Sequence, residues 1–183
     1  MIDYRFAFLV PAALILALAG CGWFGGNKEK EANASAYCPT PLSVQDANRL
    51  TRFKAGAGRD PRDVAFEAAL VQTNAACSIS RNTMDVSVFM QIAVNAGPAV
   101  GGGVTRVPFF VRVMDANGSV IVGRDEFADY KLSAASPRGM SREELGIRIP
   151  FNQVADIGGY KIAVGLLPTP DELEFNRRAA ARQ

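Results

Sequence analysis

The amino-acid sequence predicts an all-β protein, an antiparallel β-sandwich followed by a short C-terminal helix. Apolar residues occupy every second position from Met84 to Val94, and polar residues such as Asp85, Ser87 and Gln91 lie between them. This period of two residues is typical of a strand with one buried face. Short apolar segments recur along the rest of the chain with turn residues between them, which favours about seven or eight strands.

The first long apolar segment covers residues 64–79 and is long enough to form a helix. The alternating segment after it favours a strand instead, because two long strands joined by a short turn pair as antiparallel neighbours. We therefore expect a hairpin over residues 64–94. The preceding residues 44–53 fit either an opening strand or a short helix capped by Ser43.

A second hairpin is predicted over residues 104–123. Its two apolar arms are joined by the turn segment 115–118, which ends in Gly118, where a tight turn needs a positive φ angle. Pro108 interrupts the first arm and has no backbone N–H. It therefore indicates a sheet edge or a bulge at that position.

Further strands are expected over residues 125–132, 145–151 and 160–167. Together with the two hairpins they indicate an immunoglobulin-like or fibronectin-like sandwich, in which two antiparallel sheets pack face to face. The single tryptophan is Trp23, far from these strands, so the buried tryptophan of antibody domains is missing.

The end of the chain predicts a helix. Thr169 suits the N-cap, Pro170 suits the first helical position, and Glu172 at the third position can complete a capping box. The segment also carries Arg177, Arg178 and Arg182. These arginines either contact anionic lipid or another protein, or remain solvated and complement the helix dipole.

The beginning of the chain predicts export and lipidation. An uncharged apolar run from Phe6 to Ala19 is too short to cross a bilayer as a helix. It leads into residues 18–21 (Leu-Ala-Gly-Cys), which resemble the lipobox of bacterial lipoprotein precursors. The resemblance implies that residues 1–20 are a signal peptide and that acyl chains on Cys21 anchor the protein in a membrane. An ordinary signal peptide or a short membrane anchor is the alternative.

The segment after the cysteine predicts where the domain is held. Gly22 follows Cys21, and in the better-known sorting rule for bacterial lipoproteins a residue other than aspartate favours the outer membrane, here facing the periplasm. Residues 21–36 contain glycines and charged residues without an apolar period, so they are expected to form a flexible tether. Residues 37–183 then form a single domain.

The remaining cysteines predict a disulfide. With Cys21 assigned to lipid, Cys38 and Cys77 are left as an even pair in a compartment that permits disulfides. The chain contains no histidine, and these two thiols lack the close spacing of a zinc site. We therefore expect no bound metal.

We expect neither catalysis nor a cofactor. Because the chain has no histidine, catalytic triads with a serine or cysteine nucleophile are excluded, and so is most zinc-dependent hydrolysis. The acidic pairs at residues 125–126 and 143–144 are adjacent on strands, so their side chains point to opposite faces. The glycine-rich residues 97–103 lack the lysine and following helix of a phosphate loop. With 20 basic and 18 acidic residues, the chain has no charge signature of nucleic-acid binding.

Several segments resemble a family of small lipoproteins from alphaproteobacteria. They are residues 38–77, 108–118, 147–151 and 173–177. The resemblance covers most of the mature chain and supports export, lipidation and the fold. No activity is established for that family, so the resemblance implies nothing about catalysis.

The sequence favours a non-catalytic protein-interaction or envelope-assembly module, with the membrane and an envelope protein as partners. We expect the contact at a sheet edge or at the end loops, first at Pro108 and at residues 97–103. The alternative is a binding module for a small molecule, a glycan or a cell-wall polymer. That alternative requires aromatic residues exposed on one face, whereas most phenylalanines here are expected in the core.

Overall fold

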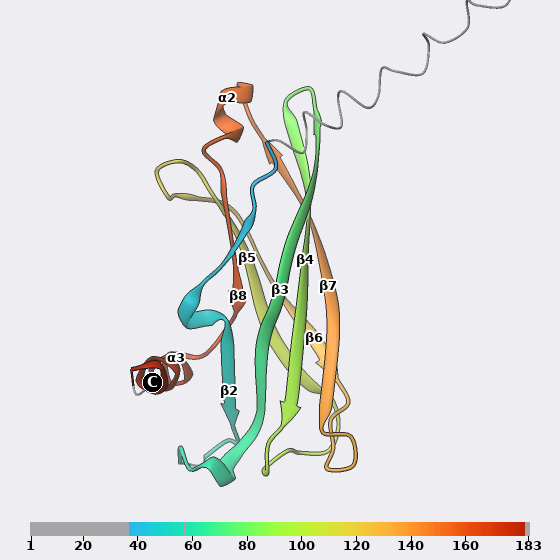
Figure 1. The fold of residues 1–183 in the computed structure, drawn as a ribbon, viewed down its shortest axis with the longest axis vertical. Helices are drawn as coiled ribbons and strands as arrows, with labels where there is room; N and C mark the ends of the chain where they lie inside the picture. The colour runs from blue at the N-terminus through green and yellow to red at the C-terminus, as the bar shows by residue number, and fades with distance from the viewer. Residues whose placement is uncertain (1–36, 57, 182–183) are drawn as a thin grey trace, which may run out of the picture.

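The computed structural model describes residues 37–56 and 58–181 and confirms the predicted two-layer sandwich (Figure 1). One sheet has the order β1-β8-β5-β6, and the other has the order β2-β3-β4-β7. The first sheet consists of β1 (Pro41–Ser43), β8 (Lys161–Leu166), β5 (Thr105–Met114) and β6 (Val120–Tyr130). The second consists of β2 (Arg49–Phe53), β3 (Val64–Ser80), β4 (Thr83–Ala96) and β7 (Arg138–Pro150). Neighbouring strands are antiparallel, except that β1 and β8 run parallel to each other.

The hydrophobic core lies between the two sheets. The alternating residues of β4 from Met84 to Val94 point into it and are at most 1% exposed. Val107 and Phe109 of β5 belong to the same core cluster. The period of two residues in the sequence therefore marks the buried face of the central strand, as predicted.

The chain forms the predicted long hairpin between β3 and β4, so residues 64–79 are a strand. β2 pairs only with residues 64–69 of β3. Beyond that point β3 pairs with β4 alone and contains a bulge between Leu70 and Gln72. The second part of β3 is therefore an open edge of its sheet.

Residues 44–53 contain both of the elements between which the sequence did not decide. A single 3₁₀ turn, η1 (Gln45–Ala47), precedes β2, and its N-cap is Val44 rather than Ser43. The short strand β1 was not expected, because three residues carry too little pattern. It forms through its parallel pairing with residues 162–164 of β8.

The second hairpin also agrees with the prediction. The Asp115 carboxylate accepts hydrogen bonds from the N–H groups of Asn117 and Ser119, each at 2.9 Å. Gly118 has a φ angle of +84°, which favours glycine at this position. The expected strands on either side of Arg124 form one continuous strand, β6, because the whole segment pairs with β5.

The prediction of a sheet edge or a bulge at Pro108 is wrong. β5 lies between β6 and β8, and its irregularity is between Val113 and Met114. The Pro108 carbonyl accepts a hydrogen bond from the N–H of Leu167, just beyond the end of β8. Pro108 has no N–H to return a hydrogen bond to Leu167, and the pairing of β5 with β8 accordingly ends at Phe109 and Leu166.

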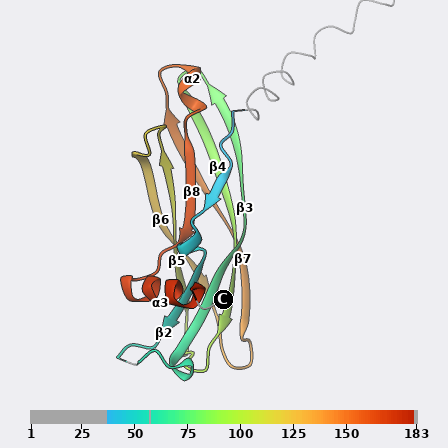
Figure 2. The same cartoon turned by 60° about the vertical axis from the view of Figure 1, so that its left-hand side comes forward.

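The C-terminal helix α3 (Pro170–Ala180) has the predicted capping box. Thr169 Oγ1 accepts from the Glu172 N–H, and the Glu172 carboxylate accepts from the Thr169 N–H. The helix lies beside β2 (Figure 2), where Phe175 makes an edge contact with Phe53 at 5.2 Å between ring centroids. Arg52 of β2 pairs with the buried Glu172 at 2.5 Å. The remaining short elements are η2 (Pro61–Asp63) and α2 (Val154–Ile157).

Candidate docking surface

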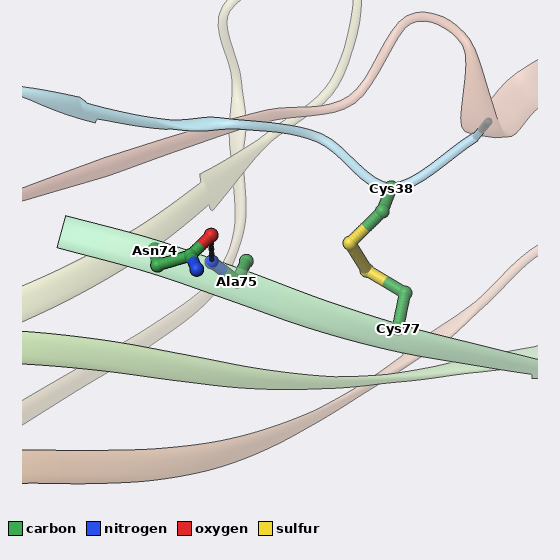
Figure 3. Close-up of a disulfide and its surroundings, with 4 residues drawn as sticks. All are labelled: Cys38, Asn74, Ala75 and Cys77. Atoms are coloured by element: carbon green, nitrogen blue, oxygen red, sulfur yellow. Dashed lines mark hydrogen bonds between the residues drawn. A yellow bond between two sulfur atoms is a disulfide. The ribbon is translucent and has the colours of Figure 1, made fainter. Parts of the chain in front are cut away.

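The structure pairs two of the three predicted site residues. Cys38 and Cys77 form the expected disulfide, with 5.5 Å between their Cα atoms (Figure 3). The bond joins the segment before β1 to the open part of β3. Cys21 lies outside the described residues, together with residues 1–20 and the rest of segment 21–36, so lipidation stays a prediction.

The part of β3 that pairs with β4 alone is covered on its other side by three local contacts. The Asn74 side chain accepts a hydrogen bond from the N–H of Ala75 at 2.8 Å, as Figure 3 shows. The Thr73 hydroxyl donates to the carbonyl of Pro41 at 3.5 Å, and the disulfide follows at Cys77. The Asn74 contact occupies the Ala75 N–H, a backbone group that an added strand would need, and the other two contacts cover the same edge.

Charged side chains protect the long edge strands β6 and β7 from pairing with a further strand. Arg124 and Glu126 are opposite Val111 and Phe109, so they point toward the inner side of their sheet. The Arg124 guanidinium donates to the Gly146 carbonyl of β7 at 3.1 Å. Inward-pointing charges oppose the addition of another strand. The structure therefore does not favour the sheet edges that the sequence suggested for docking.

The two places singled out in the sequence differ in exposure. Pro108 is buried, so it is not itself a contact point. Residues 101–104 are exposed and fit an end loop. Gly97, however, packs against β3, because a Cβ atom at this position would meet the Val64 carbonyl oxygen at 2.2 Å.

The acidic pairs do not form a common site. Asp125 points outward to Arg112, whereas Glu126 lies on the inner side near Arg124. Glu143 and Glu144 are likewise on opposite faces of β7, because they pair with consecutive residues of β4. Within the part of the chain that the structure describes, no group of three or more potential metal ligands occurs.

The outer face of the β1-β8-β5-β6 sheet carries apolar side chains in several rows, with charged residues between them. Pro108 is opposite Phe127, and Leu42 is opposite Ala163, so these residues share the side that faces away from the core. We call this surface the apolar face. Its exposed apolar members are Leu42, Val44, Ile121, Phe127 and Leu167.

Arginine and aspartate side chains flank the aromatic residues of the apolar face. The guanidinium of Arg106 lies 5.4 Å from the Phe127 ring centroid and 3.0 Å from the Asp129 carboxylate. Its hydrogen bond with Asp129 raises the pKa of Arg106. Arg112 repeats the arrangement with Phe110 and Asp125, at 5.2 and 2.6 Å. Each positive charge on these rows is therefore balanced by a neighbouring negative charge.

Of the eight phenylalanines in the described residues, four are buried (Phe53, Phe66, Phe109 and Phe151), so the expectation that most lie in the core is not met. Phe127 departs furthest from it, at 56% exposed. A signal for this was present in the sequence. Asp125, Phe127 and Asp129 alternate with the buried Ala128 and Tyr130. A period of two residues places Phe127 on the same side as the two aspartates, which is the outer side.

The arginines of α3 are engaged within the domain. Arg177 pairs with Asp46 of η1 at 2.9 Å, and Arg178 pairs with Glu174 at 3.1 Å. Arg182 lies outside the described residues. For the described arginines, these contacts favour the structural interpretation over a lipid or protein contact.

Comparison with known proteins adds no family to this geometry. No protein-family model matches the sequence, and no curated protein matches it. In the described part of the chain, none of the helices has the length and apolar character needed to span a membrane.

Proposed function

We propose that this chain is a lipid-anchored protein of the bacterial cell envelope that acts as a non-catalytic protein-interaction module. Acyl chains on Cys21 hold it at the membrane, in our proposal the outer membrane facing the periplasm, and residues 37–183 make the contact. The observation that carries the interaction is the exposure of Phe127 among other apolar side chains of the apolar face. Exposed apolar patches with a large aromatic residue are typical of interaction sites.

The chemistry of the apolar face selects the kind of partner. Arg106 and Arg112 are paired with Asp129 and Asp125, so these rows offer no excess charge to an anionic lipid or to a nucleic acid. An apolar surface of another envelope protein fits them, with the two ion pairs supplying polar contacts on either side of Phe127. Because charged side chains protect the edges of β6 and β7, a contact through the sheet face is favoured over the addition of a strand at either edge.

The docking proposal predicts that Phe127→Glu releases the partner. Burying a carboxylate in place of the aromatic ring is expected to cost about 2 kcal/mol or more of binding free energy, roughly thirtyfold in Kd. The measurement is crosslinking in intact cells, followed by purification of the full chain and quantification of the attached protein by mass spectrometry.

Val71→Glu is the matched control for this experiment. Val71 is also a strand residue with 56% exposure, but it belongs to the opposite sheet. We expect it to retain the wild-type crosslink. Equal crosslinking of the wild type and Phe127→Glu, or equal losses in both variants, contradicts docking through the apolar face.

The anchor is tested separately. Cys21→Ser is expected to block acylation and removal of the signal peptide, so that the purified protein retains residues 1–20 and carries no acyl chains. An intact-mass measurement of the purified protein checks this. A mass unchanged apart from the substitution itself would contradict lipidation without affecting the docking proposal.

A further inference from the structure

A small hollow lies on the outer face of the other sheet, away from the apolar face. Its volume is about 160 Å³, and it is lined by Gln72, Asn74, Phe89, Met90, Gln91 and Arg142. Ligand pockets commonly have about 300 to 1,000 Å³, so this hollow has room for one functional group rather than for a large molecule.

Three strands and a bulge build the hollow. Gln72 of β3 is opposite Gln91 of β4, and Gln91 is opposite Arg142 of β7, so these side chains form one row across the sheet. Asn74 and Phe89 form the next row. The bulge in β3 lies directly before Gln72, and bulges commonly redirect side chains at functional sites.

Arg142 supplies the charge of the hollow. Its guanidinium carbon lies 5.2 Å from the centroid of the Phe89 ring. Among the described residues no acidic side chain forms an ion pair with it, whereas Arg148 on the same face of β7 is paired with Asp85 at 2.7 Å. A guanidinium held over a ring by a cation–π contact uses none of its N–H groups for that contact, and their fork matches a carboxylate.

The amide side chains add oriented donors. The Asn74 oxygen accepts from the Ala75 N–H, so the Asn74 amino group is the end that is left to face a ligand. The Gln91 amino group lies 2.9 Å from the Met140 sulfur, which fixes the position of that side chain. Gln72 completes the polar wall. The donors of Asn74 and Arg142 are suited to the oxygens of an anion.

We propose that this hollow binds the carboxylate group of a small ligand, with Arg142 as the bidentate donor and Asn74 as a second donor. The inference does not depend on the docking surface, because the two lie on different sheets. An amino acid derivative and a sugar acid both carry the required group. The experiment therefore includes one probe of each kind.

The test is an NMR titration of the purified full-length protein with N-acetylalanine, with galacturonate and with the uncharged N-acetylalanine amide. We expect saturable shifts of the Arg142 and Asn74 side-chain signals with at least one carboxylate and none with the amide. The carboxylate that binds identifies the source of the group. No saturable shift with either carboxylate, or equal binding of the amide, would overturn the proposal.

Variants on one strand separate binding from folding. Arg142→Gln is expected to weaken carboxylate binding at least tenfold, because it removes a charged hydrogen bond. Arg148→Gln, on the same face of β7, is expected to leave binding unchanged. Glu144→Gln is expected to strengthen carboxylate binding, because Glu144 lies on the same face and its negative charge repels a carboxylate ligand. Equal losses in the two arginine variants, or weaker binding in Glu144→Gln, would contradict the assignment.

Discussion

Replacing both Cys38 and Cys77 with serine is expected to lower the free energy of unfolding by about 2 to 5 kcal/mol. The disulfide joins residues that are 39 positions apart. In the chain-entropy model, closing a loop of this length stabilises the fold by roughly 4 kcal/mol, because the cross-link removes freedom from the unfolded chain. The double replacement is preferred because a single one leaves a free thiol.

The measurement is urea unfolding of the full chain, followed by circular dichroism. Tryptophan fluorescence is unsuitable because the only tryptophan, Trp23, precedes the sandwich. Wild-type protein with a reductant is the control and is expected to show the same loss as the double variant. Unfolding free energies that agree within about 0.5 kcal/mol for variant and wild type would contradict a stabilising disulfide.

The same replacement has a local consequence at β1. This strand has only three residues, and Cys38 lies shortly before it. The Val44 N–H donates to the Val164 carbonyl at 2.9 Å just after the strand. Hydrogen exchange at Val44 is therefore expected to accelerate more than exchange in β4 when the disulfide is absent, since short edge elements open locally.

The fold features that the sequence predicted are those with local signals. The alternation from Met84 to Val94, the turn ending in Gly118 and the capping box at Thr169 depend on neighbouring residues only. Their structures follow from strand period, backbone freedom and hydrogen bonding within a few residues. The disulfide prediction was also correct because the number of cysteines left few alternatives.

The features that the sequence did not predict depend on distant segments. β1 exists because β8 provides a partner more than 100 positions later, and Pro108 fits an internal strand because β8 ends beside it. Short motifs cannot show such pairings. The hollow beside Arg142 has the same origin, since its residues come from β3, β4 and β7 and meet only through the sheet register.

The glycine-rich segment 97–103 shows how one motif can combine different roles. The sequence indicated a flexible loop between strands. Gly97 instead packs tightly on β3, whereas Gly101 and Gly102 have open space around the position of a Cβ atom. Only the first glycine of the segment has a backbone neighbour that excludes a side chain.

Gly97→Ala is expected to lower the free energy of unfolding by about 3 kcal/mol, at the upper end of typical overpacking costs. The added Cβ atom would lie 2.2 Å from the Val64 carbonyl oxygen and 2.7 Å from its carbon. Neither segment can move freely, because the Gly97 N–H donates to the Ala65 carbonyl and the Ala99 N–H donates to the Val64 carbonyl, each at 2.9 Å. Relief of the clash requires breaking hydrogen bonds at the start of β3.

Gly101→Ala provides the matched control within the same loop. No atom lies within 4 Å of the added Cβ, so the native backbone can accept alanine. Alanine also restricts the unfolded chain more than glycine does, so the variant is expected to be neutral or more stable by about 0.4 to 1 kcal/mol. Urea unfolding of the two variants under the same conditions measures the difference. Equal stabilities would show that the contact of Gly97 with Val64 does not constrain the fold, and the whole segment would then act as the flexible loop that its composition suggests.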